Sequence, residues 1–168
     1  FNFLMVTDLR DDIKNISSVI KVFSSLQDEN IRLTIIGDGP DKEKLTTMSN
    51  DHINFLGRLK NKEVLEELGH HHCVIINSRI ETFSIVALES LASGRPVIYT
   101  RCGGVEENLS KESGISIEIN NNDELKKAML SIQQKYNSFK PKYLQSLTDH
   151  FSKSNIASKL DDIYLDTY

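Results

Sequence analysis

Two carboxylates, Glu81 and Glu89, bound the segment of this chain that is best suited to bind a ligand rich in hydroxyl groups. From residue 83 onward the segment reads as a helix that is apolar nearly all round, so we expect the helix to be buried. A buried carboxylate such as Glu89 is costly unless it is hydrogen-bonded or paired. The two residues lie about 12 Å apart at the ~1.5 Å rise per residue of a helix, so they could hold different hydroxyl groups of one extended ligand. An internal salt bridge of Glu89 is the alternative.

The backbone between the two carboxylates predicts an anion site. The N–H groups of Phe83, Ser84 and Ile85 fall at the start of the predicted helix, where no acceptor within the helix is available to them. The N-terminus of a helix also carries a partial positive charge. Both properties suit a phosphate group.

Two cations, Arg10 and Lys14, follow the first apolar run and lie close to the start of another predicted helix. Cationic side chains beside free backbone N–H groups are suited to a diphosphate. The alternative is that both residues are solvated surface charges.

A glycine-rich turn at residues 37–40 (Gly-Asp-Gly-Pro) lies between a predicted strand and a predicted helix. Glycines in such a turn let the backbone approach a ligand closely. The turn has the spacing of neither the dinucleotide-binding fingerprint nor the P-loop. A purely structural turn is an equal alternative.

Composition and spacing argue against several other kinds of site. The formal net charge of −4 over 168 residues gives no general attraction to nucleic acid. The histidines at 70–72 are adjacent on a helix and point in different directions, so we expect no metal site there. Cys73 and Cys102 fit a reduced cytosolic protein. No apolar run approaches the roughly 18 residues that a membrane span needs.

Short apolar runs alternate along the chain with longer segments of helical periodicity. The predicted strands are residues 3–6, 31–36, 53–56, 73–76, 96–99 and 115–119. Helices are expected at 16–26, 40–48, 61–68, 84–93 and 121–132, and from 154 onward, where Ile156, Leu160, Ile163 and Tyr164 form one stripe. Asn61 and Asn121 are the predicted caps of two of them. This alternation predicts an α/β domain with a doubly wound, mostly parallel six-stranded sheet.

Ligands of such sheets bind outside the carboxyl ends of the strands. The loops at these ends carry most of the candidate residues, which we therefore expect to face one crevice: Arg10, Lys14, Arg58, Arg79, Glu81 and the pair Gly103-Gly104. The chain begins at Phe1, inside a predicted strand, which favours a domain excised from a longer protein.

Several segments, in order along nearly the whole chain, resemble the C-terminal domain of the GT-B fold in family 4 of the retaining glycosyltransferases. The turn at 37–40 with Leu45 is similar to the family's GDGP-xxxxL turn, and residues 54–58 (Asn-Phe-Leu-Gly-Arg) are similar to its F-L-G strand end. Residues 78–89 match S-x-x-E-x-F-x-x-x-x-x-E. Residues 92–98 match A-x-G-x-P-V-[IV], and 103–107 resemble G-G-x-x-E.

The resemblance implies roles at the phosphate and sugar end of a nucleotide-sugar donor. Lys14 would bind the donor phosphates, and the N–H groups of Ser84 and Ile85, next to Phe83, would bind the diphosphate. Glu81 would contact hydroxyl groups of the donor sugar. Glu81 and Lys14 are therefore the candidate catalytic residues.

The resemblance also implies contacts at the nucleoside end of the donor. Glu89 would hold the ribose. The backbone around Arg58 and Leu59 would meet the base, and Gly37 would pass close to the ligand.

The chain departs from the family in the first loop, where the family reads G-R-L-x-x-x-K. Asp8 stands at the usual Arg position, and the loop is one residue longer. Arg10 is the candidate that would supply the missing charge.

The activity implied is that of a hexosyltransferase that transfers a sugar with retention of configuration and without a metal or cofactor. Residues 1–168 would be one nucleotide-sugar-binding domain, the C-terminal half of a two-domain enzyme. The absent N-terminal domain would bind an acceptor such as a glycan or lipid-linked sugar, as in cell-surface polysaccharide biosynthesis. We expect a cytoplasmic location, any membrane association coming from that domain, and little activity of this part alone.

Two alternatives keep the fold but change the function. One is a non-catalytic, partner-binding module. The other is a different reaction, that of a sugar-nucleotide epimerase or a phosphorylase, although no cofactor-bearing lysine motif of the phosphorylase type is evident.

Overall fold

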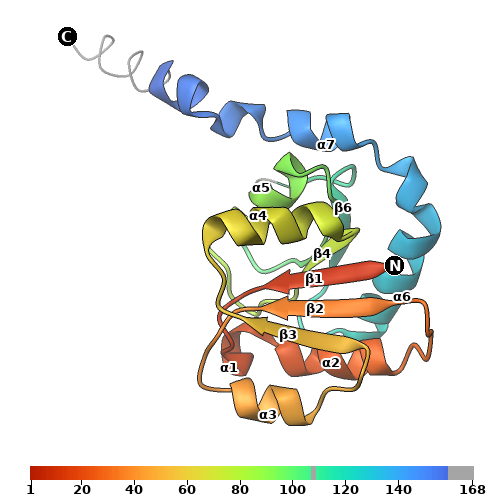
Figure 1. Ribbon diagram of the computed structural model, residues 1–168. Coiled ribbons are helices and arrows are strands. Elements are labelled where there is room, and N and C mark those ends of the chain that lie inside the picture. Colours follow the sequence, from red (N-terminus) through yellow and green to blue (C-terminus); the bar gives the residue numbers. More distant parts are fainter. Residues whose placement is uncertain (107–108, 159–168) are drawn as a thin grey trace.

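The computed structural model describes residues 1–106 and 109–158 and contains a six-stranded parallel sheet (Figure 1). The strands are β1 (Asn2–Val6), β2 (Arg32–Ile36), β3 (Ile53–Gly57), β4 (Cys73–Ile76), β5 (Val97–Thr100) and β6 (Gly114–Ile117). Their order is β3-β2-β1-β4-β5-β6, and every neighbouring pair is parallel. The predicted Rossmann-like, doubly wound α/β fold is confirmed.

Helices cover both faces of the sheet (Figure 1). One face carries α1 (Asp11–Lys14), α2 (Ile16–Ser24), α3 (Lys42–Thr47) and α6 (Asn122–Lys135). The other carries α4 (Asn61–His70), α5 (Ile85–Ala92) and α7 (Pro141–Ser146). Short 3-10 turns follow α6 and α7, at Tyr136–Ser138 and Asp149–Phe151. Each face has its own hydrophobic core, which explains why the strands between them are nearly continuous apolar runs.

Helix α6 shows how local sequence and core packing agree. The Asn121 side chain accepts a hydrogen bond from the Glu124 N–H at 3.0 Å, as the predicted cap requires. The apolar positions four and three residues apart face the sheet: Leu125, Ala128, Met129 and Ile132 are buried.

Two local predictions differ from the structure, and a third, the helix from residue 154, is described only as far as residue 158. Asn61 is the first residue of α4 rather than its cap; Lys60 is the cap, and its N–H donates to the Glu63 carboxylate at 2.7 Å. Strand β6 ends at Ile117, so Ile119 lies beyond it and is partly exposed. Of the C-terminal stripe, Ile156 is exposed, and Leu160, Ile163 and Tyr164 lie outside the described residues.

The position of β1 and β4 determines where a crevice can form. These strands are neighbours in the centre of the sheet, but the chain leaves them toward opposite faces, to α1 and α2 after β1 and to α5 after β4. The two connections therefore diverge at the carboxyl edge and leave an opening between them, which is the usual ligand position in open α/β sheets.

The loop after β1 runs close to the glycine turn after β2. Leu9 N–H donates to the Asp38 carbonyl at 3.0 Å, and Gly37 N–H donates to the Gly57 carbonyl at 2.8 Å. Gly37 has a φ of 143°, and a Cβ at this position would overlap the carbonyl oxygen of Thr7. The glycine therefore permits the close approach of the two loops.

Gly37→Ala should lower the free energy of unfolding by about 2 kcal/mol or more, because both the φ angle and the Thr7 carbonyl exclude a side chain. Urea denaturation followed by circular dichroism measures this. Gly69→Ala is the matched control, since its Cβ would meet open space in α4; it should leave stability unchanged or raise it by up to about 1 kcal/mol. Equal effects of the two substitutions would show that the loops need no such close contact.

Candidate functional site

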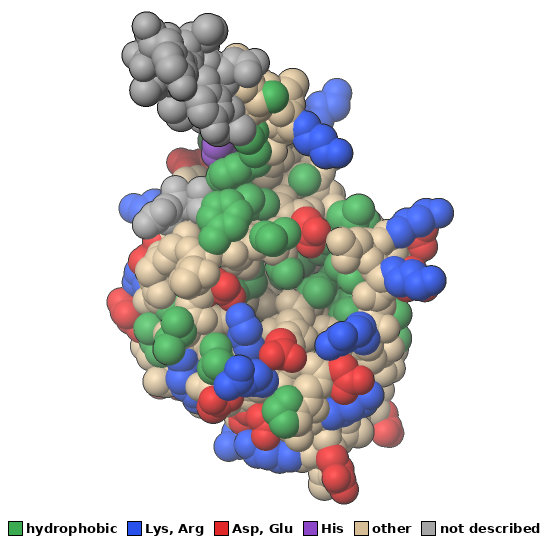
Figure 2. Space-filling model, turned by 90° about the vertical axis from the view of Figure 1, so that its left-hand side faces the viewer, with side chains coloured by type: hydrophobic (Ala, Val, Ile, Leu, Met, Phe, Trp, Pro, Cys, Tyr) green, Lys and Arg blue, Asp and Glu red, His purple; other side chains and the backbone are tan. Residues whose placement is uncertain are grey.

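A cavity of about 270 Å³ opens at the carboxyl ends of β1 and β4. Figure 2 looks onto this edge of the sheet and shows a hollow, with hydrophobic side chains above it and charged side chains of both signs below it. The lining residues of this crevice are Met5, Val6, Thr7, Asp8, Lys14, Ile75, Ile76, Asn77, Ser78, Glu81, Phe83, Ser84, Ile85 and Val86. The crevice therefore lies at the point where the winding of the sheet reverses.

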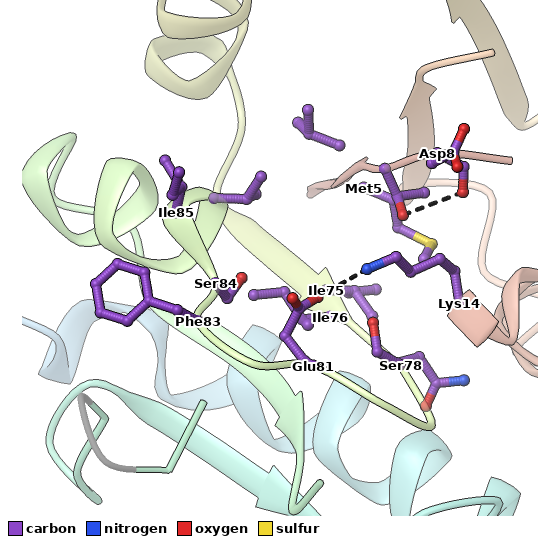
Figure 3. Close-up of a pocket in the computed structure, with 14 residues that line it drawn as sticks. Met5, Asp8, Lys14, Ile75, Ile76, Ser78, Glu81, Phe83, Ser84 and Ile85 are labelled. Carbon is purple, nitrogen blue, oxygen red and sulfur yellow. Dashed lines mark hydrogen bonds and ion pairs between the residues drawn. The ribbon is translucent and has the colours of Figure 1, made fainter. Parts of the chain in front are cut away.

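Lys14 and Glu81 meet inside the crevice. The Lys14 side chain reaches from α1 toward Glu81, which lies on the loop between β4 and α5 (Figure 3). Lys14 Nζ and Glu81 Oε2 are 2.8 Å apart, and the two side chains are only 23% and 18% exposed. A cation and an anion in this geometry neutralise each other, and each remains in reach of a ligand that offers a better partner.

The short helix α1, which carries Lys14, is held in place by its first residue, Asp11, which is almost fully buried. The Asp11 carboxylate accepts from Ser17 N–H at 2.7 Å and from Lys44 Nζ at 2.9 Å. Burial by itself raises the pKa of Asp11, but these hydrogen bonds and the Lys44 charge outweigh it and lower the pKa. Asp11 N–H in turn donates to the Asp41 carboxylate at 2.8 Å. The ionised carboxylate thus connects α1 to α2 and α3.

Arg79 holds the loop after β4 against α1. Its guanidinium donates to the backbone carbonyls of Asp11 and Asp12 at 2.6 and 3.0 Å and to the Asn15 side chain at 2.6 Å. It also donates to Asn120 Oδ1 at 2.8 Å. The prediction that Arg79 faces the crevice was wrong: four acceptors outside the crevice take up its donors. It positions Lys14 and Glu81 instead.

The loop that carries Glu81 is supported from behind by the glycine pair after β5. Glu81 forms a parallel bridge with Gly103, and Gly104 N–H donates to the Glu81 carbonyl at 3.2 Å. A Cβ at Gly104 would collide with the carbonyl of Thr82. The pair Gly103-Gly104 therefore supports the wall of the crevice and is not part of its lining.

The start of α5 forms the wall beside Glu81. Ser84 caps the helix and accepts from Ala87 N–H at 3.3 Å. Within the described ranges, the backbone N–H groups of Phe83, Ser84 and Ile85 donate to no protein acceptor. The side chains of Phe83 and Ile85 are substantially exposed, and the Phe83 ring meets Phe151 edge-on at a centroid distance of 5.7 Å. The amides of this wall could bind an anion, and its apolar side chains could pack against a flat ligand.

Glu89 lies one turn further along α5 and does not line the crevice. Burial raises the pKa of its carboxyl group. Among the residues that the structure describes, no cation or hydrogen-bond donor pairs with this carboxylate, so the internal salt bridge considered above does not form there. Glu89 is thus a partly buried acid that no described residue compensates.

The remaining predicted site residues lie on neighbouring loops, outside the lining of the crevice. Arg10 is exposed, and its guanidinium is 3.8 Å from the Asp12 carboxylate. Gly37, Arg58 and Leu59 lie at the ends of β2 and β3. The pKa of the nearby Asp38 is lowered mainly by the hydrogen bond from Gly39 N–H, then by the charge of Lys42, and least by the charge of Arg58. Their predicted contacts with a nucleoside remain predictions.

Sequence reasoning expected the loops after β1 and β4 at the crevice but named no site role for four of the residues that line it. These are Thr7, Asp8, Asn77 and Ser78. The signal was present, because the rule that ligands bind at strand ends applies to the last residues of each strand as well as to the following loops. Asn77 also supports the site, since its side chain donates to the Asn15 carbonyl at 3.0 Å.

The three consecutive histidines have separate environments. His71 is buried, with Nδ1 2.6 Å from the Glu67 carbonyl and Nε2 2.8 Å from Thr34 Oγ1. His72 Nδ1 accepts from Asn2 N–H at 3.0 Å. Within residues 1–106 and 109–158, no group of three or more His, Cys, Asp or Glu side chains could hold a metal ion. No helix in the same ranges is long and apolar enough to cross a bilayer.

Solved structures with the same fold include nucleotide-bound glycosyltransferase-like proteins. HepE of Anabaena in complex with UDP superimposes with a TM-score of 0.88 at 15% identity, over 99% of this chain and 49% of HepE. The apo form of the lipopolysaccharide outer core galactosyltransferase WaaB gives 0.87 at 16% identity, over 99% and 49%. At these identities the likeness shows the fold alone.

Curated relatives share more of the sequence. N-acetyl-alpha-D-glucosaminyl L-malate synthase of Bacillus anthracis is 27% identical over 92% of this chain and 42% of its own length. Alpha-monoglucosyldiacylglycerol synthase of Acholeplasma laidlawii is 29% identical over 91% and 40%. The chain thus spans less than half the length of these two relatives. The family model described as glycosyl transferases group 1 matches residues 1–144. Because that match covers most of the sequence, the chain belongs to the glycosyl transferases group 1 family.

Proposed function

We propose that this chain binds a nucleoside-diphosphate sugar in the crevice and forms the donor-binding half of a retaining hexosyltransferase. The observation that carries the proposal is the meeting of Lys14 and Glu81, at 2.8 Å, beside the free amides at the start of α5. One cation, one carboxylate and a helix N-terminus are the groups that a sugar diphosphate needs within a few ångströms of each other. The fold shared with UDP-bound HepE supports a nucleotide ligand.

The ligand-free arrangement suggests how the donor would be received. The diphosphate accepts hydrogen bonds from the backbone N–H groups of Ser84 and Ile85. It also attracts the Lys14 ammonium group, which then donates hydrogen bonds to both the phosphate and Glu81. Glu81 becomes available to accept hydrogen bonds from hydroxyl groups of the sugar. The lone carboxylate of Glu89, further along the same helix, would accept from the ribose hydroxyl groups.

The chemical step needs stabilisation of the departing nucleoside diphosphate. Lys14 and the α5 amides would supply it, because they are held in place before negative charge develops. No metal ion or cofactor is part of this proposal, and no general base is assigned. The acceptor, a glycan or a lipid-linked sugar, would bind to an N-terminal domain of the same protein, in the cytoplasm or at the membrane surface, so this chain alone should catalyse little.

The first test is calorimetric titration of the 168-residue chain with UDP, GDP and ADP. We expect one of the three to bind, with a dissociation constant between about 10 µM and 1 mM, because only half of the proposed site is present. No heat with any of them at millimolar concentration would contradict the proposal and favour a non-catalytic module on the same fold.

Lys14→Met should weaken the binding of that nucleotide about 10- to 100-fold, since it removes a charge-assisted hydrogen bond to phosphate. Isothermal titration gives the dissociation constants. Lys21→Met is the control: Lys21 is exposed on α2, and its removal changes the net charge equally without touching the crevice. An equal loss in both variants would mean that Lys14 acts only through the overall charge.

Glu89→Gln should stabilise the ligand-free chain increasingly as the pH rises. The raised pKa means that ionising Glu89 opposes folding, so its cost is absent below the unfolded pKa of about 4.3 and appears in full above the folded value. The difference in unfolding free energy between the variant and the unaltered chain should therefore grow between about pH 4 and pH 7. Glu66→Gln, on the exposed face of α4, should show no such growth.

A second substitution at the same residue, Glu89→Ala, should weaken nucleotide binding by about 1–3 kcal/mol, the range of a charge-assisted hydrogen bond. Titration of the two Glu89 variants thus separates stability from binding. Unchanged affinity in Glu89→Ala would show that Glu89 does not contact the ribose. Donor binding would then rest on the residues that line the crevice.

A further inference from the structure

The charged side chains that line the crevice do not balance. They are Asp8, Lys14 and Glu81. Lys14 and Glu81 form an ion pair at 2.8 Å and cancel each other. Asp8 therefore leaves the lining with a net negative charge, which is unexpected in a crevice proposed to receive a diphosphate.

The Asp8 carboxylate is paired with no cation among residues 1–106 and 109–158. The interactions of Asp8 in the structure go through its backbone carbonyl, which accepts from Thr7 Oγ1 at 3.3 Å and from Arg10 N–H at 2.8 Å. In the described part of the chain no lysine, arginine or histidine lies within ion-pair distance of the carboxylate. The Arg10 guanidinium, expected to supply charge to the crevice, is instead next to Asp12.

Asp8 and the free amides lie on opposite walls of the crevice. Asp8 stands at the end of β1, and Ser84 and Ile85 stand at the start of α5 across the gap, with Lys14 below (Figure 3). An anion held by the α5 amides therefore has a residue of like charge on the other side of the crevice. The repulsion acts across a cavity of about 270 Å³ and grows with the charge that the ligand exposes on that side.

The free nucleoside diphosphate and its sugar ester differ in this charge. The terminal phosphate of the free diphosphate has its second ionisation at a pKa of about 6, so near neutral pH it carries almost one more negative charge than the same phosphate esterified to a sugar. An unbalanced carboxylate must therefore disfavour the free diphosphate more than the ester.

We propose that Asp8 is a specificity-determining residue that discriminates between the sugar donor and the free nucleoside diphosphate left after transfer. The inference rests on the proposed function and adds to it a residue that favours release of the product. Asp8 makes no contact that holds the fold together, since its side chain is exposed and lacks an ion-pair partner among the described residues, so its charge can be removed without loss of structure.

The test compares the free diphosphate with its sugar ester in the unaltered chain and in Asp8→Asn. The pair is the one whose base binds: UDP with UDP-glucose, GDP with GDP-mannose, or ADP with ADP-glucose. At low salt and about pH 7.5, Asp8→Asn should tighten binding of the free diphosphate roughly two- to fivefold more than that of the ester. The change should shrink near pH 5.5, where the terminal phosphate takes up its proton, and in about 0.5 M salt.

Two variants make the comparison specific to the crevice. Asp12→Asn removes the same charge from α1, four residues further along, but its side chain is 70% exposed beside Arg10 and outside the lining, so the ratio of the two dissociation constants should stay unchanged. Asp8→Glu keeps the charge and should keep the ratio. An unchanged ratio in Asp8→Asn, or the same change in Asp12→Asn, would overturn the role of Asp8 while leaving donor binding intact. If the unaltered chain binds no nucleotide, the proposed function and this inference both fail.

Discussion

The candidate site depends on one side chain that does not enter it. The Arg79 guanidinium joins the loop after β4 to α1 and its C-cap through three hydrogen bonds, and Arg79 N–H adds a fourth to the Ile13 carbonyl at 2.7 Å. The parallel sheet brings β1 and β4 together, but the chains that leave them diverge toward opposite faces. The hydrogen bonds of Arg79, with that of Asn77 to the Asn15 carbonyl, hold the two segments together and so bring Lys14 close to Glu81. Arginine suits the task because its planar fork of donors can satisfy several carbonyls at once.

Several polar groups around the crevice have few or no hydrogen-bond partners among the described residues. Amides at the start of α5 point to no protein acceptor in the described ranges, and Glu89 is partly buried with a raised pKa. Among the described residues, Lys14 is paired with Glu81 alone. Such groups reduce the stability of the free domain, and a polar ligand that pairs with them recovers that loss as binding free energy. Stability and binding are therefore expected to oppose each other at this edge of the sheet.

The chain belongs to the glycosyl transferases group 1 family and shares its fold with HepE in complex with UDP, and both findings are in line with the proposed nucleotide-sugar ligand. The charged residues that line the crevice do not all favour an anionic ligand. Arg10 is engaged with Asp12, and Asp8 faces the crevice in its place. Any donor that binds must therefore be held mainly by Lys14 and backbone amides. The two relatives named above are more than twice as long as this chain, which therefore represents less than half of their length.

The amino-acid sequence alone determined the six strands, their alternation with helices and the edge of the sheet where the site lies. These follow from apolar runs such as 73–76 and from caps such as Asn121, which are local signals. It also identified Lys14 and Glu81 as candidates. Only the tertiary structure decided that the two form an ion pair, that Arg79 turns away from the crevice, and that Asp8 lines it without an ion-pair partner among the described residues. Residues 67 positions apart meet only after the sheet has formed, and the direction of a long side chain depends on which acceptors the completed fold places around it.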